Sequence, residues 1–204
     1  MKMSLHPQGS DEWRRDRLGI PSASRFSDII TPKTLKRSSG KEYLYELVAE
    51  LDSGMLTPQP DTWHMKWGKE HEARAVDMYA FMTGVDPEEC GFCVHSSGIA
   101  GATPDRLVGN EGAMEAKCPA LPKNHIKTML SQQIPSDYRL QVAGGLWVTE
   151  REWWDYVSFH PNHPDKIAII RVTREDMAAE LKAISEILPV FHKELWSTLK
   201  ALQS

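Results

Sequence analysis

The sequence predicts a single α/β domain over residues 1–204, with helices first, a small mixed β-sheet in the middle and a closing helix. Apolar residues recur at three- and four-residue spacings before residue 83 and after residue 173, which is typical of amphipathic helices. Short stretches rich in β-branched and aromatic residues lie between Cys90 and Val172, which is typical of strands. The 204 residues are 41% hydrophobic and 25% charged, a composition that suits one globular domain.

The N-terminal part is predicted to be helical. Apolar stripes, bounded by Gly, Ser or Thr, indicate helices over residues 10–18, 23–30, 41–51 and 62–82. Residues 31–40 separate the second helix from the third and combine Lys and Arg with Ser, Thr, Pro and Gly. This composition predicts an exposed basic loop.

The second half of the sequence is predicted to contain the strands of the sheet and two more helices. Strands are expected over residues 90–96, 102–108, 113–117, 153–160 and 167–172, and a helix over 137–149. Thr173 and Asp176 resemble a capping box that opens the last helix. Pro189 is expected to kink this helix, because it removes one backbone donor.

Net charge and hydropathy narrow the function classes. The net charge of −4 does not by itself indicate a nucleic-acid partner, but phosphate binding needs only a local basic surface. No run of about 18 apolar residues predicts a membrane span. The first residues lack the apolar core of a signal peptide, so we expect a cytoplasmic protein.

The three cysteines leave two interpretations open. An odd number argues against a disulfide framework and agrees with a reducing compartment. Cys90 and Cys93 form a CxxC motif, and together with His95 and Cys118 they could supply four zinc ligands. One CxxC without a second paired motif is a weak signal, so ordinary strand packing is the favoured interpretation.

The residues with the clearest chemistry lie in a predicted strand–turn–strand unit from Thr103 to Lys117. If the turn is centred near Asn110, Asp105 and Glu115 lie opposite one another, with side chains about 5 Å apart. Glu115 and Lys117 are two residues apart on one strand and therefore share a face. Two carboxylates and an ammonium group suit Mg²⁺ or Mn²⁺ and the hydrolysis of a phosphodiester.

Several motifs together resemble the phage lambda exonuclease family of PD-(D/E)xK nucleases, which includes the YqaJ-like viral recombinase nucleases. They occur in the order of the family and cover the chain from about residue 10 to about residue 195. The motifs are Trp13 with residues 17–24 (RLGIPSAS), residues 67–72 (WGKEHE), 103–105 (TPD), 115–119 (EAKCP), 141–142 (QV) and 146–149 (LWVT).

This resemblance implies a restriction-endonuclease-like PD-(D/E)xK core with a central mixed sheet flanked by helices. It also implies Mg²⁺-dependent 5′→3′ digestion of one strand of duplex DNA from an end, in phage-type homologous recombination. A ring-shaped homotrimer and a single-strand annealing partner protein are further implications. Mn²⁺ is expected to be tolerated in place of Mg²⁺.

The resemblance also assigns catalytic roles. Asp105 and Glu115 match the metal ligands, and the backbone carbonyl of Ala116 matches a third. Lys117 matches the residue that activates the attacking water. The supporting active-site residues, projected from flanking helices, correspond to Glu72 and Gln141.

Five further residues are expected to bind DNA. Arg17 and Ser24 match positions that hold a terminal 5′-phosphate in relatives, where a guanidinium and a hydroxyl are suitable donors. Lys123 matches another basic phosphate contact in the family. Thr103, in the TPD motif, is also expected to bind DNA. Met65 aligns with an apolar side chain that relatives wedge into the duplex end, although an ordinary helix Met is an equal alternative.

One position departs from the family. His95 and Ser96 stand where a further acidic residue is expected, about ten positions before Asp105. His95 is therefore a candidate ligand that would favour Mn²⁺, and the choice between one metal and two stays open.

Two other functions remain as alternatives. A PD-(D/E)xK endonuclease, of the restriction or junction-resolving kind, could use the same core, although Arg17 and Ser24 favour the recognition of DNA ends. A non-catalytic DNA-binding recombination scaffold is the third reading. It is disfavoured because two carboxylates on one sheet face repel each other unless a cation or a proton relieves them.

Overall fold

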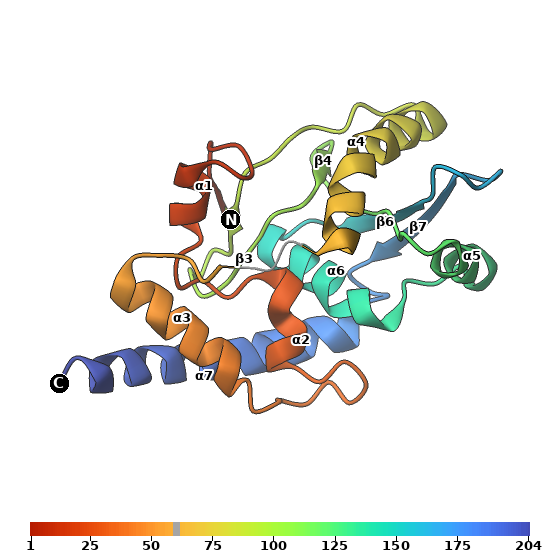
Figure 1. Ribbon diagram of the computed structural model, residues 1–204. Coiled ribbons are helices and arrows are strands. Elements are labelled where there is room, and N and C mark those ends of the chain that lie inside the picture. The colour runs from red at the N-terminus through yellow and green to blue at the C-terminus, as the bar shows by residue number, and fades with distance from the viewer. Residues whose placement is uncertain (59–61) are drawn as a thin grey trace.

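The central sheet is mixed, as the sequence predicts, and consists of four strands (Figure 1). The computed structural model describes residues 1–58 and 62–204. The strands are β4 (Arg106–Val108), β5 (Gly112–Lys117), β6 (Trp153–Phe159) and β7 (Ile167–Thr173), in that spatial order. β5 pairs antiparallel with β4 but parallel with β6, and β6 pairs antiparallel with β7.

Helices cover both faces of this sheet. Successive strand residues point to opposite sides, and apolar residues on each side pack against helices. Met114 and Val157 pack in one cluster with residues of α4, whereas Ala113 and Tyr156 belong to the larger core that contains α2, α3, α6 and α7. Figure 1 shows α4 and α7 on different sides of the sheet. These helices are α2 (Phe26–Ile29), α3 (Lys41–Ser53), α4 (Trp63–Thr83), α6 (Ser136–Thr149) and α7 (Ala178–Leu202).

The helices expected from the sequence are present, and polar caps fix several of their ends. α1 (Asp11–Asp16) begins after Ser10, whose hydroxyl accepts the amide of Trp13 at 3.1 Å, and η1 (Ala23–Arg25) leads into α2. Asp176 and Thr173 exchange the predicted capping hydrogen bonds, although α7 itself begins only at Ala178. The helix continues on both sides of Pro189.

Two predicted strands are too long. Residues 90–96 contain only β2 (Cys93–Val94), and residues 102–108 are divided between β3 (Gly101–Ala102) and β4. β3 pairs with β2 in a second sheet, whereas β4 pairs with β5, so the chain changes sheets at residues 103–105. Pro104 lies at this change and lacks the amide that a continuous ladder needs.

Two elements were not expected. β1 (Lys2–Met3) is a two-residue edge strand that pairs with β2. α5 (Pro122–Ser131) buries only His125 and Thr128, so it has no long apolar stripe from which to predict it. The available signal was Pro122, because proline favours the first turn of a helix.

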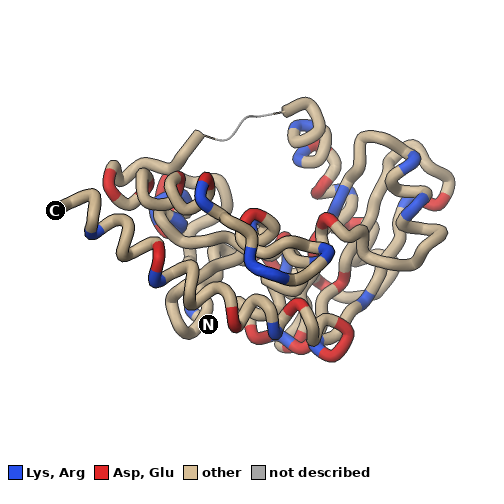
Figure 2. Tube along the Cα trace, turned by 90° about the horizontal axis from the view of Figure 1, so that it is seen from below, with Lys and Arg blue, Asp and Glu red and all other residues tan. Residues whose placement is uncertain are grey.

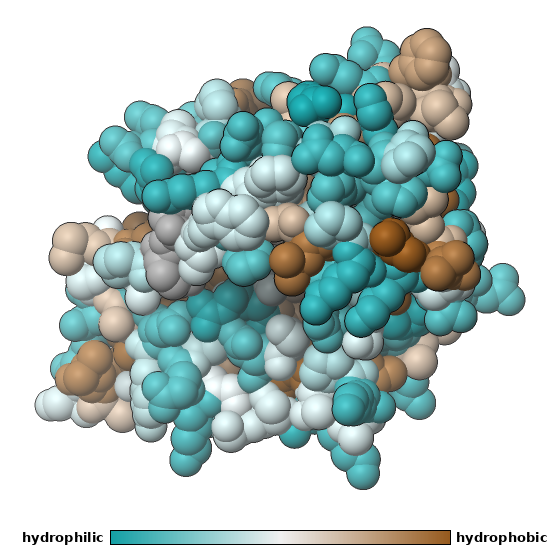
Figure 3. Space-filling view, turned by 45° about the vertical axis from the view of Figure 1, so that its right-hand side comes forward, coloured by the Kyte–Doolittle hydropathy of each residue, from teal (hydrophilic) through white to brown (hydrophobic). Residues whose placement is uncertain are grey.

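Charged residues of both signs are interspersed along the chain (Figure 2). The face in Figure 3 is mainly hydrophilic, with hydrophobic side chains in small separate groups. Because no one sign of charge dominates the molecule, a polyanion such as DNA would have to bind at a limited group of basic residues. Within the described residues, no helix combines the length and the apolar character needed to cross a membrane.

Candidate active site

The β4–β5 hairpin brings the predicted acidic pair together. Its register pairs Arg106 with Met114 and Val108 with Gly112, so the turn is centred on Asn110, as predicted. Continuing this register by one residue places Asp105 opposite Glu115. The amide of Ala116 donates a hydrogen bond of 2.7 Å to Oδ2 of Asp105, which fixes this carboxylate against β5.

Lys117 and Gln141 both bind Glu115. The Lys117 ammonium lies 2.6 Å from Oε1 of Glu115, because the two side chains share one face of β5. Gln141, on α6, donates its amide to the same oxygen at 2.6 Å. Glu115 is buried, so these two donors compensate for part of its lost hydration.

The carboxylates of this group repel one another. Burial, and then the negative charge of Glu115, raise the pKa of Asp105 well above its usual value. Burial also raises the pKa of Glu72, on α4; the charge of Arg106 opposes this rise and the charge of Glu115 adds to it. An added cation would relieve this repulsion.

Lys117 supplies a positive charge within the group. Burial lowers its pKa, but the carboxylates of Glu115 and Asp105 outweigh burial and raise the pKa above the usual lysine value. Lys117 is therefore protonated at neutral pH. Its ammonium also lies 5.1 Å from the ring centroid of Tyr138, which holds it by a cation–π contact.

The donor set fits a hard divalent cation. Oδ1 of Asp105 and Oε2 of Glu115 accept no hydrogen bond from any described residue, so each carboxylate keeps one oxygen available. Mg²⁺ prefers oxygen ligands and commonly takes one or two carboxylates plus waters and substrate phosphate. The described residues contain no group of three or more His, Cys, Asp or Glu side chains arranged for one metal ion. The candidate side-chain ligands are therefore the carboxylates of Asp105 and Glu115.

A large cleft of about 1240 Å³ opens onto Asp105. Its wall contains other residues that the sequence singled out, namely Arg17, Ser24, Met65 and Glu72. These residues come from the α1–η1 region and from α4, and the fold therefore gathers them beside the acidic pair. Among the described lining residues there is no Thr103, Lys123 or His95.

Arg17 is the cleft arginine best placed to bind an anion. Its guanidinium lies 4.2 Å from the ring centroid of Trp13, and no carboxylate of a described residue pairs with it. Arg25, in the same cleft, is already bound to Asp28 and Glu46 at 2.5 and 2.7 Å. An arginine without a carboxylate partner keeps its hydrogen-bond donors for a phosphate.

Of the other DNA-binding candidates, Ser24 and Met65 line the same cleft as Arg17, whereas Thr103 and Lys123 do not. Ser24 is exposed, with its hydroxyl 3.2 Å from that of Ser22. Met65 is in the first turn of α4 and is 43% exposed. Thr103 lies between β3 and β4, and Lys123 is exposed at the start of α5.

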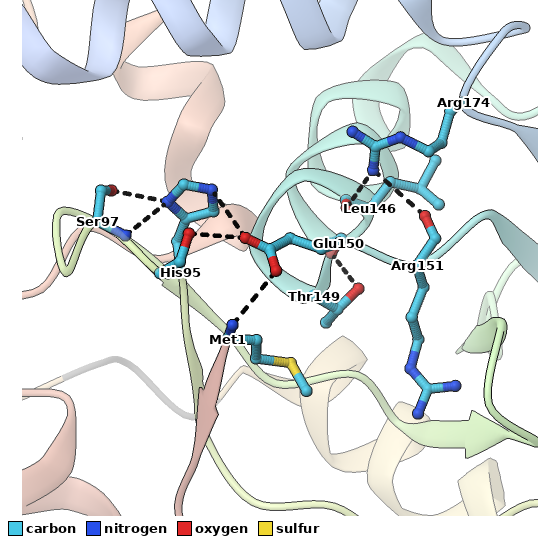
Figure 4. Close-up of polar contacts among 10 residues, drawn as sticks. Met1, His95, Ser97, Leu146, Thr149, Glu150, Arg151 and Arg174 are labelled. Carbon is cyan, nitrogen blue, oxygen red and sulfur yellow. Dashed lines mark hydrogen bonds and ion pairs between the residues drawn. The ribbon is translucent and has the colours of Figure 1, made fainter.

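His95 is engaged elsewhere. Its ring stacks on Trp147, with 3.6 Å between the centroids, and Nδ1 accepts the Ser97 amide at 3.1 Å. Nε2 lies 3.6 Å from Glu150, which also contacts the N-terminal ammonium of Met1 (Figure 4). Because the described residues form no three-residue metal cluster, His95 is not grouped with both acidic ligands.

The cysteines likewise form no zinc centre in the described part of the chain. Cys90, Cys93 and Cys118 are free thiols, and they are not gathered with His95 into a metal-binding group. Ordinary strand packing, the favoured interpretation, accounts for the buried Cys93 in β2.

Two residues near the site were missed by sequence reasoning. Tyr138 contacts Lys117 and lies one turn before Gln141 on α6, a spacing that could have identified it. Arg106 follows Asp105 directly, and its charge opposes the rise in the pKa of Glu72. No spacing in the sequence distinguishes Arg106 from other surface arginines.

Comparisons with known proteins agree with this geometry. A family model described as the YqaJ-like viral recombinase domain matches residues 12–152. The alkaline exonuclease LHK-Exo from Laribacter hongkongensis is 29% identical, with a TM-score of 0.84 over 95% of this chain and 96% of that chain. Its complex with dAMP gives 31% identity and a TM-score of 0.83 over the same shares.

A more distant structure shows the same fold. The phage related exonuclease from Haemophilus somnus 129PT is 13% identical, with a TM-score of 0.62 over 88% of this chain and 96% of that chain. No curated protein matches the chain.

Proposed function

The chain belongs to the YqaJ-like viral recombinase family, and from that premise we propose that it is a metal-dependent DNA exonuclease of recombination. One nuclease domain spans residues 1–204. The alkaline exonuclease that is 31% identical over 95% of this chain supports a nuclease acting on DNA. The observation that carries the proposal is the grouping of Asp105 with Glu115 and Lys117 across β5, next to a cleft that both Asp105 and Arg17 line.

The proposed metal ligands are Asp105, Glu115 and the backbone carbonyl of Ala116. Mg²⁺ bound there would stabilise charge on the reacting phosphate and lower the pKa of a bound water, and Mn²⁺ would be tolerated. Gln141 holds Glu115 in place through its 2.6 Å hydrogen bond. His95 stays a candidate only for a second, weaker ion.

Lys117 acts as a positioned cation. We assign it to activating the attacking water, by orienting or deprotonating it, and to neutralising developing negative charge. Glu72, whose pKa is raised, lies within the same electrostatic group and is assigned to holding water or a proton near the reacting phosphate.

The proposed polarity is 5′→3′, starting from the end of a duplex. Arg17 and Ser24 would hold the terminal 5′-phosphate, since both line the cleft that opens onto Asp105. Met65, on the same cleft, would separate the terminal base pair, while Thr103 and Lys123 would contact the backbone further out. A homotrimer and a single-strand annealing partner complete the proposal.

The test uses a linear duplex phosphorylated at the 5′ end of one strand only, incubated with Mg²⁺ or with EDTA. Loss of the phosphorylated strand alone, in Mg²⁺ alone, is the expected result. Cuts within both strands, or digestion of a closed circle, would instead establish an endonuclease. Binding of DNA without cleavage in Mg²⁺ or Mn²⁺ would establish the scaffold.

A further inference from the structure

Two segments of the cleft wall are bound to one buried carboxylate, that of Glu50. Glu50 lies on α3, lines the cleft and is 8% exposed. Its Oε2 accepts the amide of Gly19 at 3.2 Å, and its Oε1 accepts the amide of Thr57 at 3.0 Å. Glu50 therefore links the segment after α1 to the segment after α3, and the proposed chemistry uses neither contact.

The first of these segments is a tight turn that carries Arg17. The amide of Ile20 donates to the carbonyl of Arg17 at 3.0 Å, and Gly19 adopts a left-handed conformation with a φ of +66°. A Cβ atom at Gly19 would lie 2.3 Å from Cγ of Leu51, so the turn lies directly against α3. The place of Arg17 on the cleft wall therefore depends on how this turn is fixed to α3. The hydrogen bond to Glu50 is the polar part of that attachment.

A second residue of α3 holds the same segment further along the chain. The hydroxyl of Tyr43 accepts the amide of Ser22 at 2.9 Å. Tyr43 and Glu50 lie two helical turns apart and therefore share one face of α3. Burial raises the pKa of Tyr43 to about 12, so this hydroxyl is uncharged at neutral pH. Glu50 is thus the acidic one of the two side chains that hold the segment from Arg17 to Ser24.

Glu50 also places a carboxylate near the guanidinium of Arg17. Burial lowers the pKa of Arg17, and the charges of Tyr43 and Glu50 oppose this fall. A half-buried cation is costly unless negative charge nearby compensates for its lost hydration. Both oxygens of Glu50 accept backbone amides, and Glu50 forms no ion pair with Arg17 within the described residues. Arg17 therefore has a compensating charge and still keeps its hydrogen-bond donors for a ligand.

We propose that Glu50 is a positioning residue of the 5′-phosphate site, which holds Arg17 in place without occupying its hydrogen-bond donors. Glu50 acts through Arg17 and contacts no DNA itself. This rests on the proposed function, because it takes a terminal 5′-phosphate as the ligand of Arg17. A carboxylate that served stability alone would change the melting temperature and leave the recognition of DNA ends unaltered.

The first experiment measures binding of the full chain to duplexes with 5′-phosphate or 5′-hydroxyl ends, in EDTA and at one salt concentration. Glu50→Gln keeps the size of the side chain and one acceptor oxygen, but it loses the charge and turns an NH₂ group toward the second amide. The ratio of the two dissociation constants should fall by about twofold to about tenfold, as for the loss of one hydrogen bond. An unchanged ratio would overturn the proposal.

A double-mutant cycle tests whether Glu50 acts through Arg17. In an Arg17→Ala background, Glu50→Gln should cause no further loss of the preference for phosphorylated ends, because the residue that it positions is gone. The same ratio of dissociation constants, measured for both single variants and the double variant, gives the coupling. Additive losses would mean that Glu50 acts independently of Arg17, and they would overturn the proposal.

Glu180→Gln is the matched control for loss of a buried carboxylate. Glu180 is 6% exposed and accepts a hydrogen bond of 2.6 Å from Arg139, but it lies on α7 and does not line the cleft. Its replacement should lower the melting temperature and leave the ratio unchanged. An equal loss of preference in both variants would assign the effect to general destabilisation and overturn the proposal.

A second variant serves if Glu50→Gln does not fold. Glu50→Asp keeps the charge but shortens the side chain by one methylene group, so it should lose at least one of the two amide contacts. The preference for phosphorylated ends should therefore fall in this variant as well. A folded Glu50→Asp with the wild-type ratio would overturn the proposal.

Cleavage in Mg²⁺ separates this proposal from the proposed function. In a cleaving protein, Glu50→Gln should raise KM for the phosphorylated duplex more than it lowers kcat. A wild-type protein that prefers phosphorylated ends, loses the preference in Glu50→Gln and cleaves no DNA would support the role of Glu50 and overturn the nuclease. A wild-type protein that cleaves duplexes but binds both ends equally would overturn the role of Glu50 and leave the nuclease standing.

Discussion

The amide of Ala116 donates a 2.7 Å hydrogen bond to the carboxylate of Asp105, so the backbone of one candidate ligand holds the side chain of another. The link joins the segment before β4 to the strand that carries Glu115 and Lys117. It leaves one oxygen of Asp105 for a cation, and the site is therefore positioned by the sheet itself.

Replacing either central residue should abolish cleavage without unfolding the protein. Asp105→Asn keeps an oxygen for the Ala116 amide but removes the charge, and Lys117→Ala removes the ammonium beside Glu115. We expect each to reduce the rate of duplex digestion by at least about a hundredfold, with unchanged circular dichroism. Asp86→Asn, an exposed aspartate, is the matched control. Wild-type rates in either variant would contradict the assignment.

Arg17→Ala should reduce the preference for 5′-phosphorylated over 5′-hydroxyl ends by about tenfold or more, because a charged hydrogen bond to phosphate is lost. The ratio of digestion rates on the two substrates measures this preference. Arg14→Ala is the control, since Arg14 lines the same cleft but is paired with Asp11 at 2.7 Å. An unchanged ratio in Arg17→Ala would remove that residue from the phosphate site.

Without metal, stability should fall as the pH rises. The pKa of Asp105 is higher in the folded protein than its usual value near 3.9, so the folded state binds more protons between the two values. Stability conferred by the protonated acid is complete below the unfolded pKa and is lost as the pH rises through the folded pKa.

Denaturant unfolding in EDTA over a pH series tests this dependence. The free energy of unfolding of Asp105→Asn minus that of wild type should be smallest below the unfolded pKa and grow as the pH rises, because the variant carries no charge. Glu72 is present in both proteins, so its own raised pKa largely cancels. A difference that stays constant with pH would contradict the raised pKa of Asp105, which burial and then the charge of Glu115 cause.

Mg²⁺ should raise the melting temperature of the wild-type protein, because an ion bound only by the folded state stabilises it. At a concentration of about one hundred times the Kd this gain is about 2.7 kcal/mol. In Asp105→Asn the shift should be much smaller, and Ca²⁺ should give a shift without cleavage if the ligands are oxygens. Equal shifts in both proteins would place the bound ion elsewhere.

The sequence predicted the parts of the fold that follow from local pattern. α7 has a long apolar stripe, and the Asp105–Glu115 pairing follows from the symmetry of a hairpin turn at Asn110. The break at Pro104 was missed, although Pro104 itself was a local signal, since proline cannot donate to a continuous ladder. The change of pairing partner from β2 to β5 depends on tertiary packing, which the local sequence does not specify.

In the candidate site, too, some contacts follow from local sequence and others depend on tertiary packing. The contact of Lys117 with Glu115 follows from their spacing of two residues on a strand. The hydrogen bond from Gln141 to Glu115 depends on how α6 docks, which no spacing specifies, and only the family resemblance singled out Gln141. For His95 the alignment suggested a metal ligand, whereas stacking on Trp147 depends on tertiary packing and had no local signal.

The pairing of β5 has a consequence for the order in which the protein folds. Its antiparallel edge joins β4 through a short turn, but its parallel edge joins β6, with Gly112 opposite Trp153 and α5 and α6 in between. Closing a short loop is faster than closing a long one. We therefore expect the two acidic residues to meet early in folding, and Gln141 to reach Glu115 only when the crossover closes. A chain in which the crossover has not yet closed would carry Asp105 and Glu115 side by side, without the hydrogen bond from Gln141 to Glu115.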